Sequence, residues 1–367
     1  MLAESHPYIR RVIRFMLLPY CYFKLVPWSE CTHSHIQVLV DLLYIFFRFK
    51  YYPDNYGPCR FWEKDRSEWC YYYGSSYNPC QRQRLRKFVQ RYDYQILYND
   101  KEFFEQFAKG LQISMPRYFG VIEPDGSYKE KIKIFLNESS AGKIIIKPID
   151  GHAGRGIMVA RRTKRGVEVK TVSQVYELGS FELTEKSVVQ ELIEQHSVVA
   201  AITSSSVNTI RLVTLWSKND DIILVSASMR FGQGDSFVDN WSGGGISVGV
   251  DTDSGVLKKF AYDKTGKRFT EHPVSGVKFN NFQIPMWDEI VKMAEVVQKA
   301  SPFYRLIGCD VAVTESGPVL IEANANPDIV YQEQVSGPIL ADKRVFDEFN
   351  NYGLLINKYQ KAIYGQS

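Results

Sequence analysis

The strongest constraint on the fold of this chain is a change of pattern near residue 99, where short apolar runs begin to alternate with helical segments. Such alternation predicts a mixed helix-and-strand body built on sheets. Helices are expected at Lys101–Lys109, which Asp100 can cap, and at Met286–Ala300. Strands are expected at Tyr118–Ile122, Ile144–Ile146, Gly156–Ala160, Val188–Ile193, Thr209–Trp216, Ile222–Met229, Leu306–Val313 and Val319–Ala323. With 367 residues, the chain is long enough for two or three compact units.

The first 98 residues differ in composition from the rest, being rich in Tyr, Trp, Phe, Arg and Cys. We expect a mainly helical region here, with helices at Tyr8–Leu18 and Ile36–Phe49 that mix basic and bulky apolar residues. Such helices are typical of membrane interfaces, so one alternative is peripheral membrane contact. The other, which we favour, is that both helices pack on the larger body, because apolar helix faces usually lie in a core.

The overall composition excludes several classes of protein. Lys and Arg number 45 against 41 Asp and Glu, and a net charge of +4 is too small to indicate nucleic-acid binding. The longest apolar run, Ile36–Phe47, contains Asp41 and is too short to span a bilayer. The N-terminus lacks a secretory pattern and the cysteines lack metal-binding spacing, so we expect free thiols and a cytoplasmic protein, with the inner face of the membrane as an alternative location. No feature predicts an oligomeric state.

A lysine and a glycine-rich loop follow the most apolar of the expected strands. Lys147 comes directly after Ile144–Ile146 and is followed by the loop Gly151–Gly156. Glycines let backbone N–H groups turn toward a bound phosphate, and the lysine adds a positive charge. The loop joins two strands and the lysine precedes the glycines, unlike the strand–loop–helix sites of Walker and Rossmann proteins. A plain hairpin turn is the alternative interpretation.

Two acids and an amide interrupt the last two expected strands. If these strands form a hairpin centred on Ser316, Asp310 lies directly opposite Glu322 and Asn324 projects from the same face. Two carboxylates about 5 Å apart at Cβ repel each other unless a cation lies between them. Oxygen ligands of this kind suit Mg²⁺. The alternative is a surface hairpin with two solvated acids.

Two arginines, Arg211 and Arg230, each interrupt an apolar strand. Guanidinium groups match the geometry of carboxylates and phosphates, so both are candidates for binding an acylphosphate or its anionic precursor. Structural salt bridges explain either arginine alone equally well. Asn240 belongs to the Gly-rich loop that follows, Gly232–Gly245.

In their order along the chain, these features resemble the ATP-grasp superfamily, and within it the sugar-transfer-associated ATP-grasp proteins found with bacterial surface-polysaccharide genes. The resemblance extends from about Lys87 to Tyr331. It rests on Asn99–Lys101, Lys147–Pro148 and the glycine loop, Val189–Ile193, Asn208–Arg211, Asp239–Asn240, Gly243–Gly245, Gly308–Asp310 and Ile321–Asn324. It implies an α+β ATP-grasp fold in which a lid subdomain, 99–187, and a larger subdomain with the metal site, 188–367, clasp ATP beside the helical region, 1–98.

The resemblance also implies roles for individual residues. Those expected to bind ATP through its phosphates, adenine or ribose are Lys101, Lys147, Gly151, His152, Gly154, Arg155, Gly156, Glu191, Ile193, Glu194 and His196. Within that set, Glu194 and His196 are the two candidates for the ribose-binding acid. Mg²⁺, with Mn²⁺ as an alternative, would be held by Asp310, Glu322 and Asn324. The residues expected to face the acyl phosphate and the acceptor are Arg211, Arg230 and Asn240.

The hypothesis for function is an ADP-forming carboxylate–amine ligase that makes an amide through an acylphosphate. The resemblance implies a sugar substrate, such as a nucleotide-linked hexuronic acid, joined to an amino acid or amino alcohol in capsule or surface-polysaccharide biosynthesis. Two alternative hypotheses assume the same fold and a different function. One is a non-catalytic or membrane-peripheral nucleotide-binding scaffold, and the other is an ATP-grasp kinase or peptide ligase.

Overall fold

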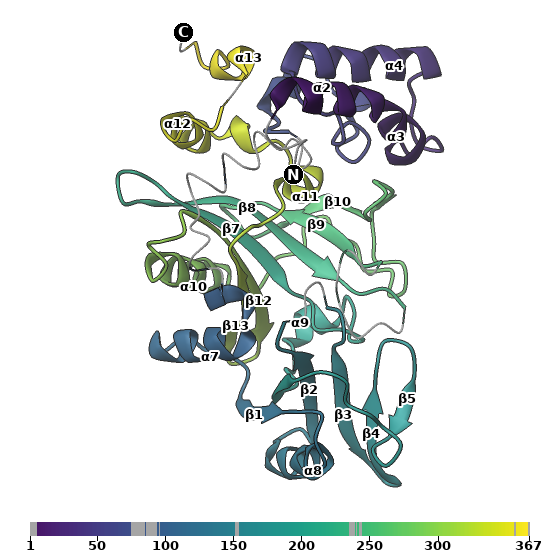
Figure 1. Ribbon diagram of the computed structural model, residues 1–367, viewed down its shortest axis with the longest axis vertical. Helices are drawn as coiled ribbons and strands as arrows, with labels where there is room; N and C mark the ends of the chain where they lie inside the picture. The colour runs from purple at the N-terminus through teal and green to yellow at the C-terminus, as the bar shows by residue number, and fades with distance from the viewer. Residues whose placement is uncertain are drawn as a thin grey trace.

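The computed structural model describes residues 6–74, 85, 94, 96–150, 154–234, 239, 241, 244–355 and 357–365. Within these residues the chain forms the expected α+β architecture with two antiparallel sheets. Figure 1 shows three parts along the long axis: the N-terminal helices at one end, the larger sheet in the middle and the smaller sheet at the other end. The site described below lies between the two sheets.

The N-terminal region is helical, as expected, and has its own aromatic core. Its helical segments are α2 (Pro7–Met16), α3 (Leu18–Tyr20), the π-helix η1 (Cys21–Leu25), α4 (His35–Tyr44), the π-helix η2 (Ile45–Phe49), and the 3₁₀ segments η3 (Phe61–Glu63) and η4 (Glu68–Tyr71). Helix α4 begins with a capping box between Ser34 and Gln37 and buries Leu42 against Tyr56 and Trp69. Helix α2 differs, because none of its side chains described over 8–16 is buried. Helix α4 therefore packs in the core of the N-terminal region and not on the larger body as expected, whereas α2 contributes no buried side chain over 8–16.

The smaller sheet has the strand order β1-β6-β2-β3-β4-β5 within the described residues. Its strands are β1 (Tyr118–Ile122), β2 (Lys143–Pro148), β3 (Met158–Thr163), β4 (Gly166–Lys170), β5 (Val175–Glu177) and β6 (Ser187–Glu191). Helix α8 (Tyr128–Glu138) covers one face and buries Ile132 and Leu136. Because β6 pairs with both β1 and β2, the boundary expected at residues 187 and 188 would divide this sheet. Short helices α6 (Ile96–Asn99) and α7 (Lys101–Gly110) precede it.

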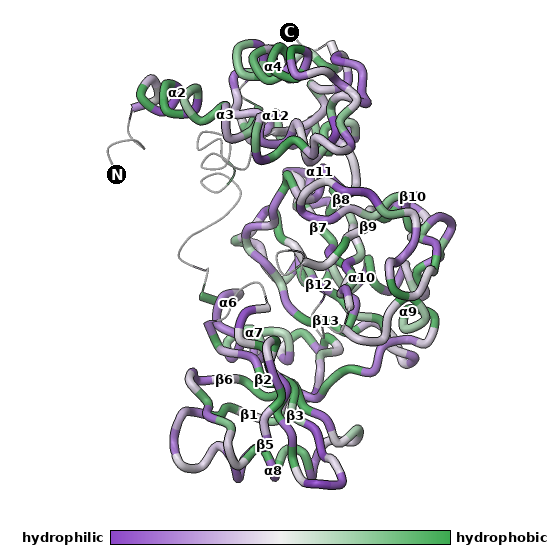
Figure 2. The backbone as a smooth tube through the Cα atoms, turned by 90° about the vertical axis from the view of Figure 1, so that its right-hand side faces the viewer, coloured by the Kyte–Doolittle hydropathy of each residue, from purple (hydrophilic) through white to green (hydrophobic). Residues whose placement is uncertain are grey.

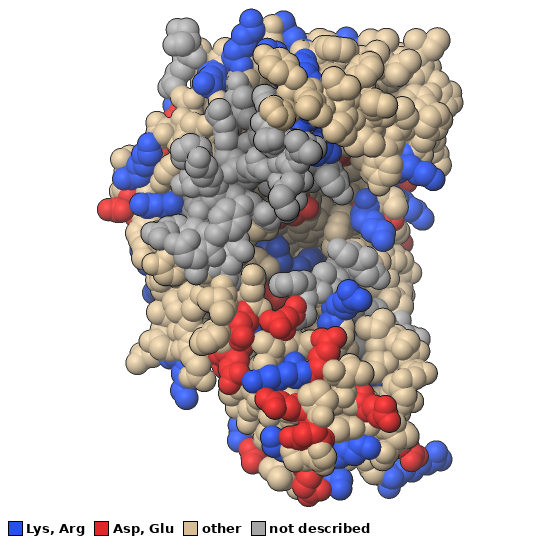
Figure 3. Space-filling view, viewed as in Figure 1, with Lys and Arg blue, Asp and Glu red and all other residues tan. Residues whose placement is uncertain are grey.

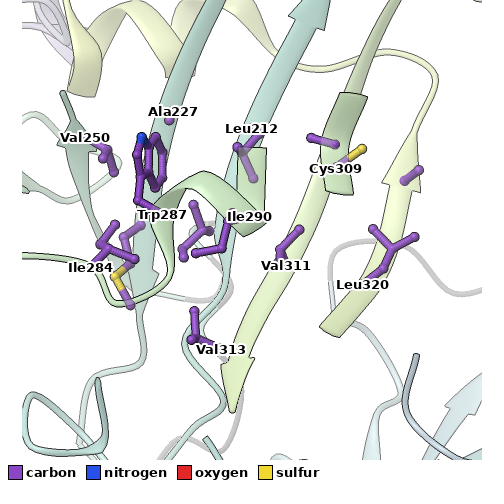
Figure 4. Close-up of a cluster of buried hydrophobic side chains, with 14 of the residues drawn as sticks. Leu212, Ala227, Val250, Ile284, Trp287, Ile290, Cys309, Val311, Val313 and Leu320 are labelled. Carbon is purple, nitrogen blue, oxygen red and sulfur yellow. The ribbon is translucent and has the colours of Figure 1, made fainter. Parts of the chain in front are cut away.

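The larger sheet has the strand order β11-β10-β9-β8-β7-β12-β13 within the described residues. Its strands are β7 (Ile210–Trp216), β8 (Ile222–Phe231), β9 (Ile246–Val250), β10 (Leu257–Tyr262), β11 (Arg268–Phe269), β12 (Leu306–Thr314) and β13 (Gly317–Asn324). Helix α10 (Trp287–Lys299) packs on one face, where Trp287 and Ile290 meet Leu212 and Val311 (Figure 4). Alternate strand residues such as Val213 and Leu215 point into the core on the other face.

The C-terminal segment connects the larger sheet to the N-terminal region. It contains α11 (Ile329–Ser336), η7 (Ile339–Ala341), α12 (Lys343–Asn351) and α13 (Lys358–Lys361), and the four-residue helix α9 (Ser197–Ala200) lies earlier in the chain. Helix α11 lies so close to β9 that a Cβ at Gly249 would stand 2.2 Å from the Val335 carbonyl oxygen. Buried Glu333 of α11 accepts a hydrogen bond from the backbone N–H of Tyr73 at 2.6 Å. None of the helices in the described ranges is long and apolar enough to cross a membrane.

Candidate active site

A cleft separates the two sheets and brings together residues from both. Its volume is about 370 Å³, which is in the range of small-molecule sites. Figure 3 shows the molecule hollowed between the two lobes, with basic side chains inside the hollow. The sequence-predicted site residues that line it are Lys101, Lys147, Gly154, Arg155, Glu191, Ile193, Arg211, Arg230, Asp310, Glu322 and Asn324. Gly151, His152 and Asn240 lie outside the described residues.

Two lysines form the basic side of the cleft. Lys147 is the penultimate residue of β2 and is 8% exposed, and its ammonium group donates to the Gln190 side-chain oxygen at 2.8 Å. Gln190 in turn donates to the Glu105 carboxylate at 2.8 Å. Burial, opposed by the charge of Glu322 and assisted by that of Lys101, lowers the pKa of Lys147 to about 8. Lys101 donates to the carbonyl oxygens of Pro148 and Ile149, and burial lowers its pKa as well. A buried ammonium whose direct partner is a neutral amide favours an anionic ligand.

The expected strand–loop–strand unit is present next to these lysines. β2 and β3 pair antiparallel, with Ile146 opposite Met158. Gly154 and Gly156 both have a φ of 73°, in the left-handed region that favours glycine. A Cβ at Gly156 would also come within 2.8 Å of the Pro148 ring. The loop therefore requires glycine at its base, and Gly154 and Arg155 line the cleft.

The acidic side of the cleft is the β12–β13 hairpin. Asp310 pairs directly with Glu322 across the two strands, and Asn324 pairs with Gly308, which confirms the predicted register. The cation that two close carboxylates require is supplied by arginine. Both oxygens of buried Asp310 are held: Arg211 binds it in a fork, with Nη2 2.7 Å from Oδ2, and Arg230 Nη2 lies 2.6 Å from Oδ2.

The two paired acids have opposite electrostatic environments. Burial by itself would raise the pKa of Asp310, but Arg211 and Arg230 hold it well below its usual range. Desolvation by the walls of the cleft and the nearby charge of Asp310 raise the pKa of Glu322. The side chain of Glu322 is 46% exposed in the cleft, 3.9 Å from Arg211 Nη2, and accepts a hydrogen bond from Asn324 Nδ2 at 3.3 Å. Asp310 is thus a buried ion-pair partner, whereas Glu322 is open to a ligand.

These residues fit a magnesium ion in part. In the described portion of the chain, no group of three His, Cys, Asp or Glu side chains is arranged to hold a metal. Mg²⁺ in nucleotide sites commonly uses one or two carboxylates and takes its other ligands from phosphates and water. Glu322, together with the amide oxygen of Asn324, meets that requirement. Asp310, which was predicted as a third ligand, has both oxygens bound by arginine.

The segment after β6 lines the cleft through Glu191, Leu192 and Ile193. The Glu191 carboxylate faces away toward the turn before β2, where it accepts from the backbone N–H of Ser140 at 2.7 Å. Neither candidate for the ribose-binding acid lines the cleft. Glu194 is exposed, and His196 caps α9 and lies 3.3 Å from the Glu315 carboxylate. Glu194 and His196 therefore lie outside the lining of the cleft.

Several cleft residues were not singled out from the sequence. Glu105 and Gln190 support Lys147, as described above. Tyr331 of α11 bonds to Ser247 at 2.6 Å, and its ring packs edge-on against Trp241 at 5.0 Å. Asp239 accepts from the backbone N–H of Thr209 at 2.8 Å, and burial raises its pKa. The sequence offered a signal for two of these residues only, because Gln190 and Asp239 lie within motifs that carry the family resemblance. The residues that they contact in the structure are distant in the sequence.

Two antiparallel sheets with a cleft between them agree with the ATP-grasp fold that the sequence motifs imply. A profile of the family described as sugar-transfer associated ATP-grasp matches residues 80–346. The chain therefore belongs to this family, as its motifs indicated. A comparison with curated proteins found no significant match.

Solved structures with a related chain trace include several ATP-grasp enzymes. The ADP complex of N5-carboxyaminoimidazole ribonucleotide synthetase is 10% identical, with a TM-score of 0.39 over 64% of this chain and 47% of that chain. D-alanyl-alanine synthetase A from Vibrio cholerae is 12% identical, with a TM-score of 0.41 over 74% and 65%. The ATP-grasp ligase PsnB with precursor, Mg and ADP is 13% identical, with a TM-score of 0.37 over 68% and 59%. This chain thus spans less than two thirds of each of these proteins, and the family assignment depends on the sequence profile.

Proposed function

We propose that this protein is an ADP-forming carboxylate–amine ligase that uses ATP and Mg²⁺. The observation that carries the proposal is the position of Glu322, which lies 3.9 Å from Arg211 Nη2 and lines one cleft together with Lys101, Lys147, Arg211 and Arg230. Lysines suit phosphates as point charges, and arginine forks suit a carboxylate or an acylphosphate. A γ-phosphoryl group and a substrate carboxylate would therefore meet beside Glu322.

The proposed reaction has two steps. A substrate carboxylate oxygen attacks the γ-phosphorus, the bond to the β–γ bridging oxygen breaks, and ADP leaves. The amine nitrogen then attacks the acyl carbon, the bond from that carbon to the phosphate oxygen breaks, and the amine loses a proton to solvent. Lys101 and Lys147 neutralise the phosphates, while Arg211 and Arg230 orient the carboxylate.

The other assigned residues support these two steps. Glu322 and Asn324 would hold Mg²⁺, which when bound withdraws charge from the phosphate oxygens. Gly154, Arg155 and Gly156 belong to the loop that would cover the phosphates, and the backbone after Glu191 would contact adenine. Roles for Gly151, His152 and Asn240 remain predictions from the family resemblance.

The substrate that best suits the cleft is a sugar carboxylate, such as a nucleotide-linked hexuronic acid, with an amino acid or amino alcohol as the amine. The family description associates these proteins with sugar transfer. Trp241 and Tyr331 line the same cleft as the two arginines and offer ring surface on which a sugar can pack. We extend the proposal to capsule or surface-polysaccharide biosynthesis on the same basis.

The test uses ¹⁸O in the substrate carboxylate. The full-length protein is incubated with ATP, Mg²⁺, a labelled nucleotide-linked uronic acid and a pool of amines, and the products are analysed by mass spectrometry. A ligase must form an amide and transfer one ¹⁸O to inorganic phosphate, and Glu322→Gln must abolish both. A phosphorylated sugar without amide would indicate a kinase. ATP binding without turnover across the pool would indicate a nucleotide-binding scaffold, and either result would overturn the proposal.

A further inference from the structure

Helix α2 turns its apolar face away from the protein. Arg11 lies over the ring of Phe46 at 5.6 Å and Arg14 over the ring of Tyr52 at 5.3 Å, so the basic side of the helix faces the body. Tyr8, Val12 and Met16, one turn apart on the other side, are 85%, 60% and 72% exposed. Figure 2 shows α2 projecting from the rest of the N-terminal region. A helix that served only to build a core would have the opposite orientation.

The exposed apolar surface continues from α2 onto α4. The ring of Phe15 lies 5.6 Å from that of Phe46 and 6.1 Å from that of Phe47, so the C-terminal end of α2 meets η2, the segment that continues α4. In the described residues, thirteen of the twenty-two exposed large apolar side chains fall between Tyr8 and Phe47. We call the outward-facing members the apolar patch: Tyr8, Ile9, Val12, Ile13, Met16, Phe23, Ile36, Leu39, Val40 and Phe47. A concentration of this kind marks an interaction surface.

The charges around the apolar patch select an anionic partner. Residues 6–29 contain Arg10, Arg11, Arg14 and Lys24 but no Asp or Glu. The next two acids along the chain are both ion-paired, Glu30 with Arg60 and buried Asp41 with Arg66. A second copy of this chain would bring two sets of these cations together, which like-charge repulsion opposes. A bilayer with acidic phospholipids supplies both an apolar interior and negative headgroups.

We propose that the apolar patch docks this protein on the surface of an anionic lipid bilayer, with α2 and α4 lying in the plane of the headgroups. The apolar side chains enter the boundary between headgroups and acyl chains, and half-buried Arg10 and exposed Lys24 contact the phosphates, whereas Arg11 and Arg14 face the body. The two sheets extend away from this end of the molecule (Figure 1), so docking leaves the cleft open to solvent. This inference is independent of the ligase proposal.

Co-sedimentation of the full-length protein tests the inference. The vesicles contain either equal parts of phosphatidylcholine and phosphatidylglycerol or phosphatidylcholine alone. The wild-type protein should bind the mixed vesicles at low salt and be released as salt increases. A Val12→Glu/Met16→Glu variant should bind about tenfold less or weaker still. The matched control, Val172→Glu/Val274→Glu, changes two side chains that are each 68% exposed elsewhere and should bind like the wild type.

A second variant tests the contribution of basic residues to vesicle binding and leaves the apolar patch unchanged. Arg10→Gln/Lys24→Gln should weaken binding to the mixed vesicles about 30-fold, at roughly 1 kcal/mol for each of the two charges. Equal binding to both vesicle types, equal loss in the control variant, or no sedimentation at low salt would overturn the inference. So would light scattering that shows a wild-type dimer and a monomeric Val12→Glu/Met16→Glu variant, because the apolar patch would then be an interface between copies.

Discussion

Replacing Lys147 with methionine should stabilise the protein while weakening its binding to ATP. The fall of the Lys147 pKa from 10.5 to about 8 corresponds to about 3 kcal/mol of unfavourable ammonium burial at neutral pH. Methionine removes that cost but leaves the Gln190 oxygen without its donor, which costs about 1 kcal/mol. The free energy of unfolding should therefore rise by about 1–2 kcal/mol at pH 7.

The difference in the free energy of unfolding between the Lys147→Met variant and the wild type should decrease as the pH rises. Between about pH 8 and pH 10.5, the unfolded wild-type chain keeps a proton on Lys147 that the folded chain has lost, so wild-type stability rises with pH. The Lys147→Met variant lacks this contribution. Its advantage should therefore shrink over this window and reverse above it. Denaturant unfolding of both proteins at pH 7 and pH 10 measures the change.

Nucleotide binding should respond in the opposite direction. Loss of one buried, charge-assisted phosphate contact is worth about 1.5–3 kcal/mol, or about 10-fold to 100-fold in Kd for ATP by calorimetry at pH 7. Wild-type affinity should also fall above pH 8 as Lys147 loses its proton. Lys143, exposed on the same strand, provides the control: Lys143→Met should leave affinity unchanged. A Lys147→Met variant that is less stable at pH 7 and binds ATP normally would refute the reasoning.

Three further substitutions separate roles within the cleft. Glu322→Gln should lower Mg²⁺-dependent turnover about 100-fold or more with little change in melting temperature. A variant whose turnover depends on Mg²⁺ concentration as the wild type does would contradict a metal-binding role. Asp310→Asn should destabilise the fold by about 3–5 kcal/mol, since it leaves Arg211 and Arg230 buried beside a neutral amide. If the variant unfolds in denaturant at the same midpoint as the wild type, these ion pairs do not contribute to stability. Gly156→Ala should cost about 1–2 kcal/mol of stability because residue 156 has a positive φ. The kcat of this variant should also fall, and a kcat equal to that of the wild type would exclude the loop from catalysis.

The features predicted most accurately depend on residues that are close in sequence. Period-two alternation and a turn at Ser316 predicted the pairing of Asp310 with Glu322, although the hairpin reaches this pairing through a register shift between Asp310 and Val311. The expected helix at Lys101–Lys109 matches α7 because Asp100 supplies the cap. Strands such as β4, β9 and β10 were not predicted, since their apolar runs are short and interrupted by charged residues or glycine. Helix α2 was misjudged because an apolar helix face does not reveal whether anything covers it.

The sequence by itself determined the family, the glycine loop beside a lysine, and a pair of acids on one hairpin. Only the tertiary structure decided what those acids contact. Arg211 pairs with Asp310 because β7 is the neighbour of β12, although 99 residues separate them, and Arg230 reaches the same carboxylate from β8. Strand order is set by the packing of the whole sheet, because any strand can offer the same backbone hydrogen bonds to any neighbour. Residue patterns within one strand therefore could not show that the arginines and the acid pair form a single ion-paired cluster.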